Sequence, residues 1–369
     1  MEVKDPELKK KELEKCLKED IQFIMIEEIH KREKTGENTL ENRYVYSCKK
    51  VNDDQKKYCI KIIDVDSYGS SNEENILNKL KENKSRILYK CEVVKKNPNK
   101  YIISELYGGS IANYIREKDK NKPFNLEEIR HIMKDVVFGL SLLNSLGINH
   151  RDIKPDNLVI NYKEENRNQD LLKSEIIIID YGLGIFNNEG KNKKVGTKGY
   201  MHPRIESIEN LNQELDIWSS GVTCLELFCG KLPKFENGNY RIPLNENTKL
   251  EFVRFVDNML QEDPNKQIKI NKLSEEPFLN NPIESFKNFT KEIGGNKYKE
   301  KEGYIELNYQ NGLNFIYEEK EDYVDELIND CFIKLNENCL FTKPVLFPMI
   351  TDISQKNQFF EDYFNNDFK

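Results

Sequence analysis

HRDIKPDN at residues 150–157 and IIIIDYG at residues 176–182 are the most informative stretches of this chain. The first contains Asp152, which can accept a proton, and Lys154, which can reach a phosphate. Asn157 and Asp180 supply oxygen atoms of the hard kind that Mg²⁺ prefers in proteins. These residue types suit phosphoryl transfer, a reaction that depends on positioning and on charge neutralisation.

Both stretches resemble motifs of the eukaryotic protein kinases, the catalytic loop HRDxKxxN and the metal-binding DFG, with Tyr181 in place of the phenylalanine. The motifs occur in the family's order, with strand-like residues at 158–160 after the first and at 176–179 before the second. The resemblance covers about residues 20–282. It implies an α+β, two-lobed fold, in which a small antiparallel-sheet lobe and a larger, mostly helical lobe hold ATP between them.

The expected small lobe covers about residues 20–105, and the expected large lobe about residues 106–282. A charged segment with leucines at helical spacing, 6–18, predicts a helix within an N-terminal extension, 1–19, that either docks on the small lobe or frays. Apolar residues at helical intervals predict a further helix at 72–80. β-branched and aromatic residues predict small-lobe strands at 23–26, 43–46, 57–63, 87–89 and 101–103.

In the large lobe, a long helix is expected at residues 126–146. Asn125 and Glu128 have the spacing of a capping box, and Gly147 suits the helix end. This helix leads the chain toward the catalytic loop. A later apolar helix contains Asp216, which the resemblance implies anchors the backbone of that loop.

The resemblance also implies a role for each residue of the catalytic loop. Asp152 orients the substrate hydroxyl or accepts its proton, Lys154 reaches the transferred phosphate, and Thr197 contacts both. Asn157 and Asp180 are the expected metal ligands.

On the nucleotide side, the resemblance implies that Lys61 holds the α and β phosphates and is positioned by an acid on the following helix. Glu73 is the first candidate for that acid, and Glu74 is the alternative. The residues expected to bind the nucleotide are Val45, Cys59, Lys61, Ser104, Glu105, Tyr107, Asn157, Val159 and Asp180.

The nucleotide roof departs from the family pattern. Kinases usually place several glycines between their first two strands, so that backbone amides can approach phosphate closely. Here Gly36 is the one glycine in the long, charged segment 28–42. Weaker or differently shaped phosphate contacts are therefore expected, and this is the main argument for the alternative interpretation, a pseudokinase.

The substrate platform departs as well. Residues 196–204, GTKGYMHPR, resemble the family's GTxxYxAPE, with Arg204 in place of the glutamate. The arginine that normally pairs with this glutamate is also changed, to Gln267. Because both partners of a normally buried pair are replaced together, no loss of the fold is implied.

Residues 183–196 contain no Ser, Thr or Tyr, so Arg151 has no phosphorylated side chain to bind in this segment. We expect a loop that is ordered without phosphorylation, with Glu189 as a candidate partner of Arg151. Lysines cluster beside the platform, either as a solvated loop or as a source of steering toward acidic protein substrates. They are Lys191, Lys193, Lys194 and Lys198.

Composition limits the partners. A net charge of −7 and a pI near 5.5 leave no basic footprint for nucleic acid, which is not an expected partner. No long apolar run predicts a membrane span or a secretion signal. The eight cysteines have no zinc-site spacing and favour reduced thiols. We expect an intracellular protein of the cytoplasm, with the nucleus left open.

Residues 283–369 form a C-terminal extension that the resemblance does not cover. Strand-like residues at 304–309 and 313–317 flank Asn311-Gly312, a favourable hairpin turn, and a helix is predicted at 322–335, so the extension is α/β in character. Its terminal aromatic residues either pack on the kinase-like domain or bind a partner protein.

The leading interpretation is a serine/threonine protein kinase that uses ATP and Mg²⁺, because a lysine at position 154 resembles that branch of the family rather than the tyrosine kinases. The alternative is a pseudokinase or scaffold that recruits partners with weak or no phosphotransfer.

Overall fold

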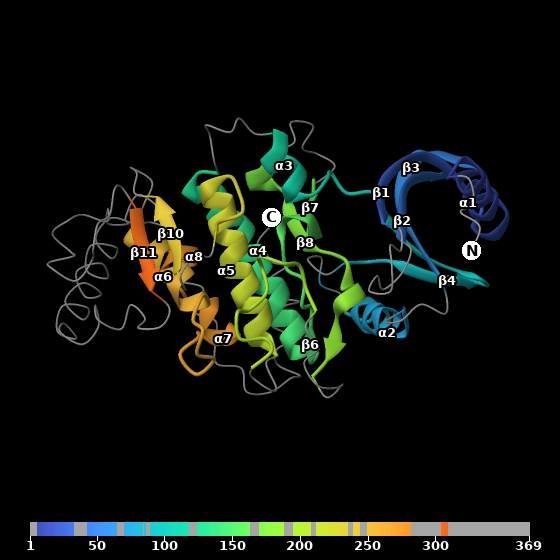
Figure 1. The fold of residues 1–369 in the computed structure, drawn as a ribbon. Helices are drawn as coiled ribbons and strands as arrows, with labels where there is room; N and C mark the ends of the chain where they lie inside the picture. The colour runs from blue at the N-terminus through green and yellow to red at the C-terminus, as the bar shows by residue number, and fades with distance from the viewer. Residues whose placement is uncertain are drawn as a thin grey trace, which may run out of the picture. The chain divides into compact units, whose positions relative to one another are not determined.

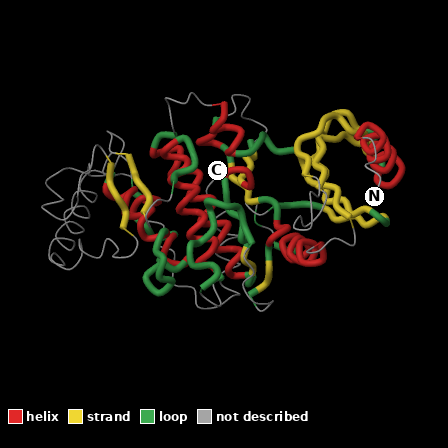
Figure 2. The backbone as a smooth tube through the Cα atoms, viewed as in Figure 1, coloured by secondary structure: helices red, strands yellow, loops and turns green. Residues whose placement is uncertain are grey.

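The computed structural model describes residues 6–32, 43–64, 70–83, 85, 89–117, 124–162, 170–187, 195–207, 212–234, 239–243, 249–281 and 304–308. All of them belong to one compact unit, residues 1–312. Within it the expected two-lobed α+β fold is confirmed, with the largest sheet in one lobe and most of the helices in the other (Figure 1, Figure 2).

The small lobe is built on a five-stranded antiparallel sheet with the order β1-β2-β3-β5-β4. Its strands are β1 (Phe23–Arg32), β2 (Arg43–Lys50), β3 (Asp53–Asp64), β4 (Glu92–Lys96) and β5 (Asn99–Glu105). Helix α2 (Ser70–Lys81) follows β3 and includes the predicted helix. Ile76, Leu77 and Leu80, spaced at helical intervals, are buried and hold α2 to the domain.

The N-terminal helix α1 (Pro6–Ile21) docks on one face of this sheet. Leu13 and Leu17, one helical turn apart, are buried there. The Tyr101 hydroxyl also donates a hydrogen bond of 2.6 Å to the Asp20 carboxylate at the end of the helix. The sheet side chains in this cluster alternate along their strands and are Tyr44, Tyr46, Cys48, Ile60, Ile62, Tyr101 and Ile103.

In the large lobe, α4 (Leu126–Ser145) and α5 (Gln213–Cys229) lie against each other (Figure 1). The predicted capping box of α4 is confirmed, with Asn125 and Glu128 each accepting the other's backbone N–H. Gly147, with φ +70°, follows the helix end. The other helices are α3 (Ile111–Glu117), α6 (Leu250–Met259), α7 (Ile270–Leu273) and α8 (Pro277–Asn280).

Short strand pairs hold the two key motifs in place. β7 (Leu158–Asn161) pairs antiparallel with β8 (Glu175–Ile178), as the sequence predicts after one motif and before the other. β6 (Ile148–Asn149) pairs with β9 (Ile185–Phe186), so the residues before the catalytic loop contact those after the DYG motif. Single turns of 3-10 helix at Pro155–Asn157, Leu171–Lys173 and Tyr181–Leu183 complete this region.

Tyr89, the one described residue of the strand predicted at 87–89, is not in a strand. β4 begins at Glu92, and Tyr89 lies in a loop, where its ring packs 6.4 Å from that of Tyr107. The Tyr89 ring therefore fills space beside Tyr107, in the segment between the lobes. Aromatic residues are common in strands, but strand propensity alone does not show that a residue is in one. Residues 86–88 lie outside the described residues.

In the C-terminal extension, the strand prediction holds for β11 (Tyr304–Asn308), and one partner of this strand was not expected. β11 pairs antiparallel with β10 (Asn239–Pro243) of the large lobe. Residues 309–317, which include the predicted turn and second strand, and the predicted helix at 322–335 lie outside the described residues. No helix of the described part of the chain is long and apolar enough to cross a membrane.

Candidate active site

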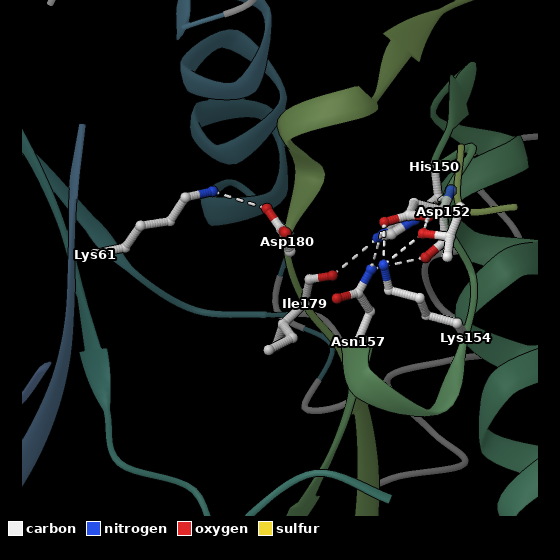
Figure 3. A network of polar contacts seen from close by, with 8 residues as sticks. Lys61, His150, Asp152, Lys154, Asn157, Ile179 and Asp180 are labelled. Carbon is white, nitrogen blue, oxygen red and sulfur yellow. Dashed lines mark hydrogen bonds and ion pairs between the residues drawn. The ribbon is translucent and has the colours of Figure 1, made fainter. Parts of the chain in front are cut away.

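Lys61, in β3, binds two carboxylates from different parts of the chain. Its Nζ donates to Glu73 Oε1 at 2.6 Å and to Asp180 Oδ1 at 2.8 Å, the second contact drawn in Figure 3. Glu73 lies in the first turn of α2 and is buried. Of the two candidate acids, Glu73 is therefore the one in contact with Lys61, and one ammonium group joins the sheet, α2 and the DYG motif.

The catalytic-loop residues form a second polar cluster. Lys154 Nζ donates to Asp152 Oδ2 at 2.9 Å and to Thr197 Oγ1 at 2.6 Å, and the Thr197 hydroxyl donates to Asp152 Oδ1 at 2.6 Å. Thr197 thus makes both expected contacts. Asn157 Nδ2 donates to the Asp152 backbone carbonyl at 2.7 Å and to its carboxylate at 3.1 Å. Asp152 is consequently fixed in position by three neighbours.

Asp216 of α5 anchors the loop backbone, as the resemblance implies. Its carboxylate accepts the N–H of His150 at 2.7 Å and the N–H of Arg151 at 2.6 Å. Complete burial raises the pKa of Asp216, against the lowering effect of these partners. The His150 ring also donates to the Ile179 carbonyl at 2.9 Å (Figure 3). The same ring packs edge-on against Tyr181. The catalytic loop and the DYG motif are therefore held as one unit.

Two residues of this unit have unusual backbones. Arg151 and Asp180 have φ of +65° and +63°, in the left-handed region that residues with a Cβ rarely adopt. Such conformations cost about 1–3 kcal/mol each and persist where surrounding contacts determine them. Here those contacts are the Asp216 carboxylate on one side and Lys61 on the other.

Arg151 contacts the loop that follows the DYG motif. Its Nε donates to the Leu183 carbonyl at 2.6 Å. The predicted partner, Glu189, lies outside the described residues. A backbone carbonyl of this loop thus accepts a hydrogen bond from the Arg151 side chain.

Four of the small-lobe residues predicted to bind the nucleotide lie on the sheet face opposite α1. Val45 pairs with Lys61 across β2 and β3, and Cys59 pairs with Ser104 across β3 and β5. Paired residues share a face, and side chains alternate along a strand, so all four point away from the α1 cluster. Burial raises the pKa of the Cys59 thiol to about 11, which makes it a packing group rather than a nucleophile.

The segment between the lobes is pinned to β7. Gly108 N–H donates to the Ile160 carbonyl at 2.8 Å, and Val159 forms an isolated antiparallel β-bridge with Ser110. The Glu105 carboxylate pairs with Lys56 at 3.3 Å and is 70% exposed, so the predicted adenine contact of Glu105 would come from its backbone. Tyr107, also predicted to bind nucleotide, packs its ring beside Tyr89.

Gln267, at a position where the resemblance implies an arginine in an ion pair, makes neutral hydrogen bonds instead. Arg204 is exposed, whereas Gln267 is buried. Gln267 Nε2 donates to the carbonyls of Met259, at 2.8 Å, and Glu214, at 3.2 Å. The amide thus satisfies backbone groups of the large lobe without a charge.

Sequence reasoning missed Glu226, whose carboxylate accepts the Tyr200 hydroxyl of the platform. Burial raises the pKa of Glu226. The sequence does contain a signal for Glu226, because it is the one acid in the mostly apolar second half of α5. Sequence reasoning also missed the ion pairs of Glu74, on α2, with Lys95 and Lys100.

The expected metal ligands fit a hard divalent cation. In Figure 3 the Asn157 amide nitrogen faces Asp152 and its oxygen points away. The Asp180 side chain is 31% exposed, so it is accessible while it contacts Lys61. One amide oxygen and one carboxylate suit Mg²⁺, which completes its shell with phosphate oxygens and water.

This architecture, with an interlobe lysine and an Asp–Lys–Asn catalytic loop, defines a protein-kinase-like phosphotransferase fold. The family model described as protein kinase domain matches residues 41–279. The chain belongs to the eukaryotic protein kinase family.

Similar proteins carry kinase names. A Dictyostelium discoideum protein with the name probable serine/threonine-protein kinase is 32% identical over 71% of this chain and 40% of its own length. An SNF1-related protein kinase catalytic subunit alpha of Arabidopsis thaliana is 28% identical over 53% of this chain and 40% of its own. Maternal embryonic leucine zipper kinase of Xenopus tropicalis is 30% identical over 61% of this chain and 35% of its own length. The chain spans less than half the length of these relatives.

Proposed function

We propose that this chain is a serine/threonine protein kinase that transfers the γ-phosphoryl group of ATP to hydroxyl groups of proteins, with Mg²⁺ as its metal. The observation that carries the proposal is the convergence of Lys61, Asp180 and Asp152, from three distant parts of the sequence, on two connected polar clusters. The names of the similar proteins support the same activity.

Each side chain has a defined task in this proposal. Lys61, held by Glu73, binds the α and β phosphates, and Asp152 orients the substrate hydroxyl or accepts its proton. Lys154, between Asp152 and Thr197, stabilises charge on the transferred phosphoryl group. Asn157 and Asp180 would hold the metal, which when bound neutralises phosphate charge.

The experiment is transfer of radiolabel from ATP to generic protein substrates. Asp152→Asn should lower the rate by about 10²- to 10⁴-fold, the range for loss of a catalytic acid or base. Asp156→Asn is the matched control, because Asp156 lies in the same loop and is exposed. Equal transfer by the wild type and Asp152→Asn would exclude the proposed enzyme.

Nucleotide binding separates this proposal from a scaffold. A ligand that binds only the folded state raises the melting temperature, so ATP with Mg²⁺ should stabilise the wild type more than ATP alone. Stabilisation by ATP without any transfer would indicate the pseudokinase. No stabilisation at millimolar nucleotide would oppose the kinase and a nucleotide-binding pseudokinase, and would favour a scaffold that does not bind nucleotide.

We also propose a preference for acidic protein substrates. Lys198 of the platform is exposed, and three further lysines precede it in sequence, outside the described residues. Clustered positive charge raises the local concentration of acidic partners. A peptide-library scan that selects arginine around the acceptor hydroxyl, rather than aspartate or glutamate, would contradict this preference.

The division of the chain into 1–19, 20–282 and 283–369 remains our proposal for its domains. The pairing of β11 with β10 supports a C-terminal extension that starts on the large lobe. A partner protein for the rest of the extension also remains a proposal.

A further inference from the structure

Glu74, the neighbour of Glu73 on α2, forms a separate ion-pair group with the sheet. Its Oε1 lies 2.8 Å from Lys95 Nζ of β4, and its Oε2 lies 3.0 Å from Lys100 Nζ of β5. The Lys100 side chain is 3% exposed and the Glu74 side chain 16%. Glu74 and Lys100 are therefore largely removed from solvent, unlike an ordinary surface ion pair, whereas the Lys95 side chain is about half exposed.

The charges in this group depend on one another. Burial raises the pKa of Glu74, but the two lysines outweigh that effect and the pKa is lowered overall. A buried lysine without its acid costs several kcal/mol, because desolvation is then not compensated. The pair between Glu74 and Lys100 consequently favours one distance between α2 and β5.

Lys100 and Lys61 lie on the same face of the sheet. β3 and β5 pair so that Lys61 is opposite Ile102 and Lys100 is opposite Ile63, and paired residues share a face. Two successive acids of α2 thus meet two lysines of one sheet face. Because successive helical residues point about 100° apart, both contacts form together in one rotational setting of α2.

Apolar contacts alone would not specify this setting. The buried face of α2 consists of Ile76, Leu77 and Leu80, and hydrophobic attraction is non-directional. An ion pair with close hydrogen-bond geometry is directional. The acids therefore add a directional constraint on the rotation of α2 to the constraint that its buried apolar face supplies.

We propose that Glu74 is a positioning residue, which with Lys100 and Lys95 holds α2 in the setting where Glu73 contacts Lys61. The inference rests on the proposed kinase function for its effect on catalysis. The geometry of α2 itself can be tested independently of that function.

The kinetic test compares Glu74→Gln with the wild-type full chain. We expect kcat/KM to fall by about tenfold, which corresponds to about 1.4 kcal/mol of transition-state stabilisation. In a Glu73→Gln background the same change should cost nothing further, because Glu74 acts through Glu73. Glu82→Gln is the matched control, since Glu82 follows the same helix and forms an exposed pair with Lys79. Independent, multiplicative losses would overturn the proposal.

Hydrogen exchange of the unliganded protein gives the readout that does not need activity. Amides of α2 should exchange faster in Glu74→Gln than in the wild type or Glu82→Gln. If the wild type transfers no phosphate, the proposed function fails. Faster exchange of α2 in Glu74→Gln would still support the positioning role of Glu74. Unchanged α2 exchange would overturn the positioning role. If Glu74→Gln does not fold, Lys95→Met, which removes the half-exposed partner, serves for both measurements.

Discussion

His202 is a buried residue whose protonation opposes folding. Its ring lies 4.8 Å from that of Trp218, and it is 1% exposed. Burial lowers the pKa of His202 to about 4, whereas an unfolded histidine has a pKa near 6.5. The unfolded chain therefore binds more protons between these values, and the stability from neutral His202 is present above about pH 6.5 and lost toward pH 4.

We predict that His202→Ala removes this part of the pH dependence. Between about pH 6.5 and 4.5, the free energy of unfolding of the variant should fall less steeply, by up to about 1.4 kcal/mol per pH unit. Urea denaturation at several pH values measures the slope. An unchanged slope would show that His202 does not titrate in this way.

The pKa of Asp257, on α6, is shifted so that protonation favours folding, the opposite of His202. Burial raises its pKa to about 7, above the unfolded value near 3.9, so the folded chain binds the extra proton. The stability that protonated Asp257 contributes is present below about pH 3.9 and lost as the pH rises through about 7. We predict that Asp257→Asn gains stability relative to the wild type from pH 5 to pH 8, measured by the same denaturation series. A constant difference across this range would contradict the prediction.

Gln267 is expected to stabilise the large lobe through its two backbone contacts. Gln267→Ala leaves the carbonyls of Met259 and Glu214 without this donor, so the free energy of unfolding should fall by about 1–3 kcal/mol. Lys266→Ala, at the exposed neighbouring position, should change it little. Equal effects of the two variants in urea denaturation would refute the role of Gln267.

Among the elements, α1 covers the outer face of the small-lobe sheet, while Lys61 and Cys59 face the other side. A helix outside the family match thus supports the strands that carry residues predicted to bind nucleotide. The sequence predicted this helix from its leucine spacing, but left open whether it docks, since docking depends on apolar residues of distant strands.

We predict that Leu17→Ala destabilises the protein by about 2–5 kcal/mol, because Leu17 is fully buried and its truncation leaves a cavity. The control is Lys15→Ala, on the same helix with a side chain that is 70% exposed. Thermal or urea unfolding measures both. A loss below about 0.5 kcal/mol for Leu17→Ala, the usual range for surface changes, would mean that α1 does not support the sheet.

Elements with local signals were predicted well, and elements with distant partners were not. The capping box and terminal glycine of α4 are encoded within a few residues. The position of β4 and the pairing of β11 with β10 depend on residues far away in the chain, which local propensity does not contain.

At the scale of the whole molecule, the lobes are joined at the site itself by the contact of Lys61 with Asp180, and the catalytic loop is joined to the DYG motif by His150. Arg151 already donates to the loop that follows, at Leu183. These contacts form without a phosphorylated residue between Leu183 and Gly196, where the sequence offers no hydroxyl acceptor.

We therefore predict that the dephosphorylated protein is active. After phosphatase treatment and removal of the phosphatase, the initial rate of phosphate transfer should stay within about twofold of the untreated rate, because no loop phosphate is needed to order Arg151. A lag, or a rate that recovers only after autophosphorylation detected by mass spectrometry, would contradict this expectation.

Local patterns in the chain were enough to establish the two lobes, the order of the motifs and the types of side chain at the site, because hydrophobic periodicity, caps and short motifs are encoded over a few residues. Folding in three dimensions settled which acid contacts Lys61, how Gln267 replaces an ion pair, and that Glu74 meets Lys100. Those outcomes depend on the direction and burial of side chains brought together from distant segments, and a one-dimensional pattern carries neither quantity.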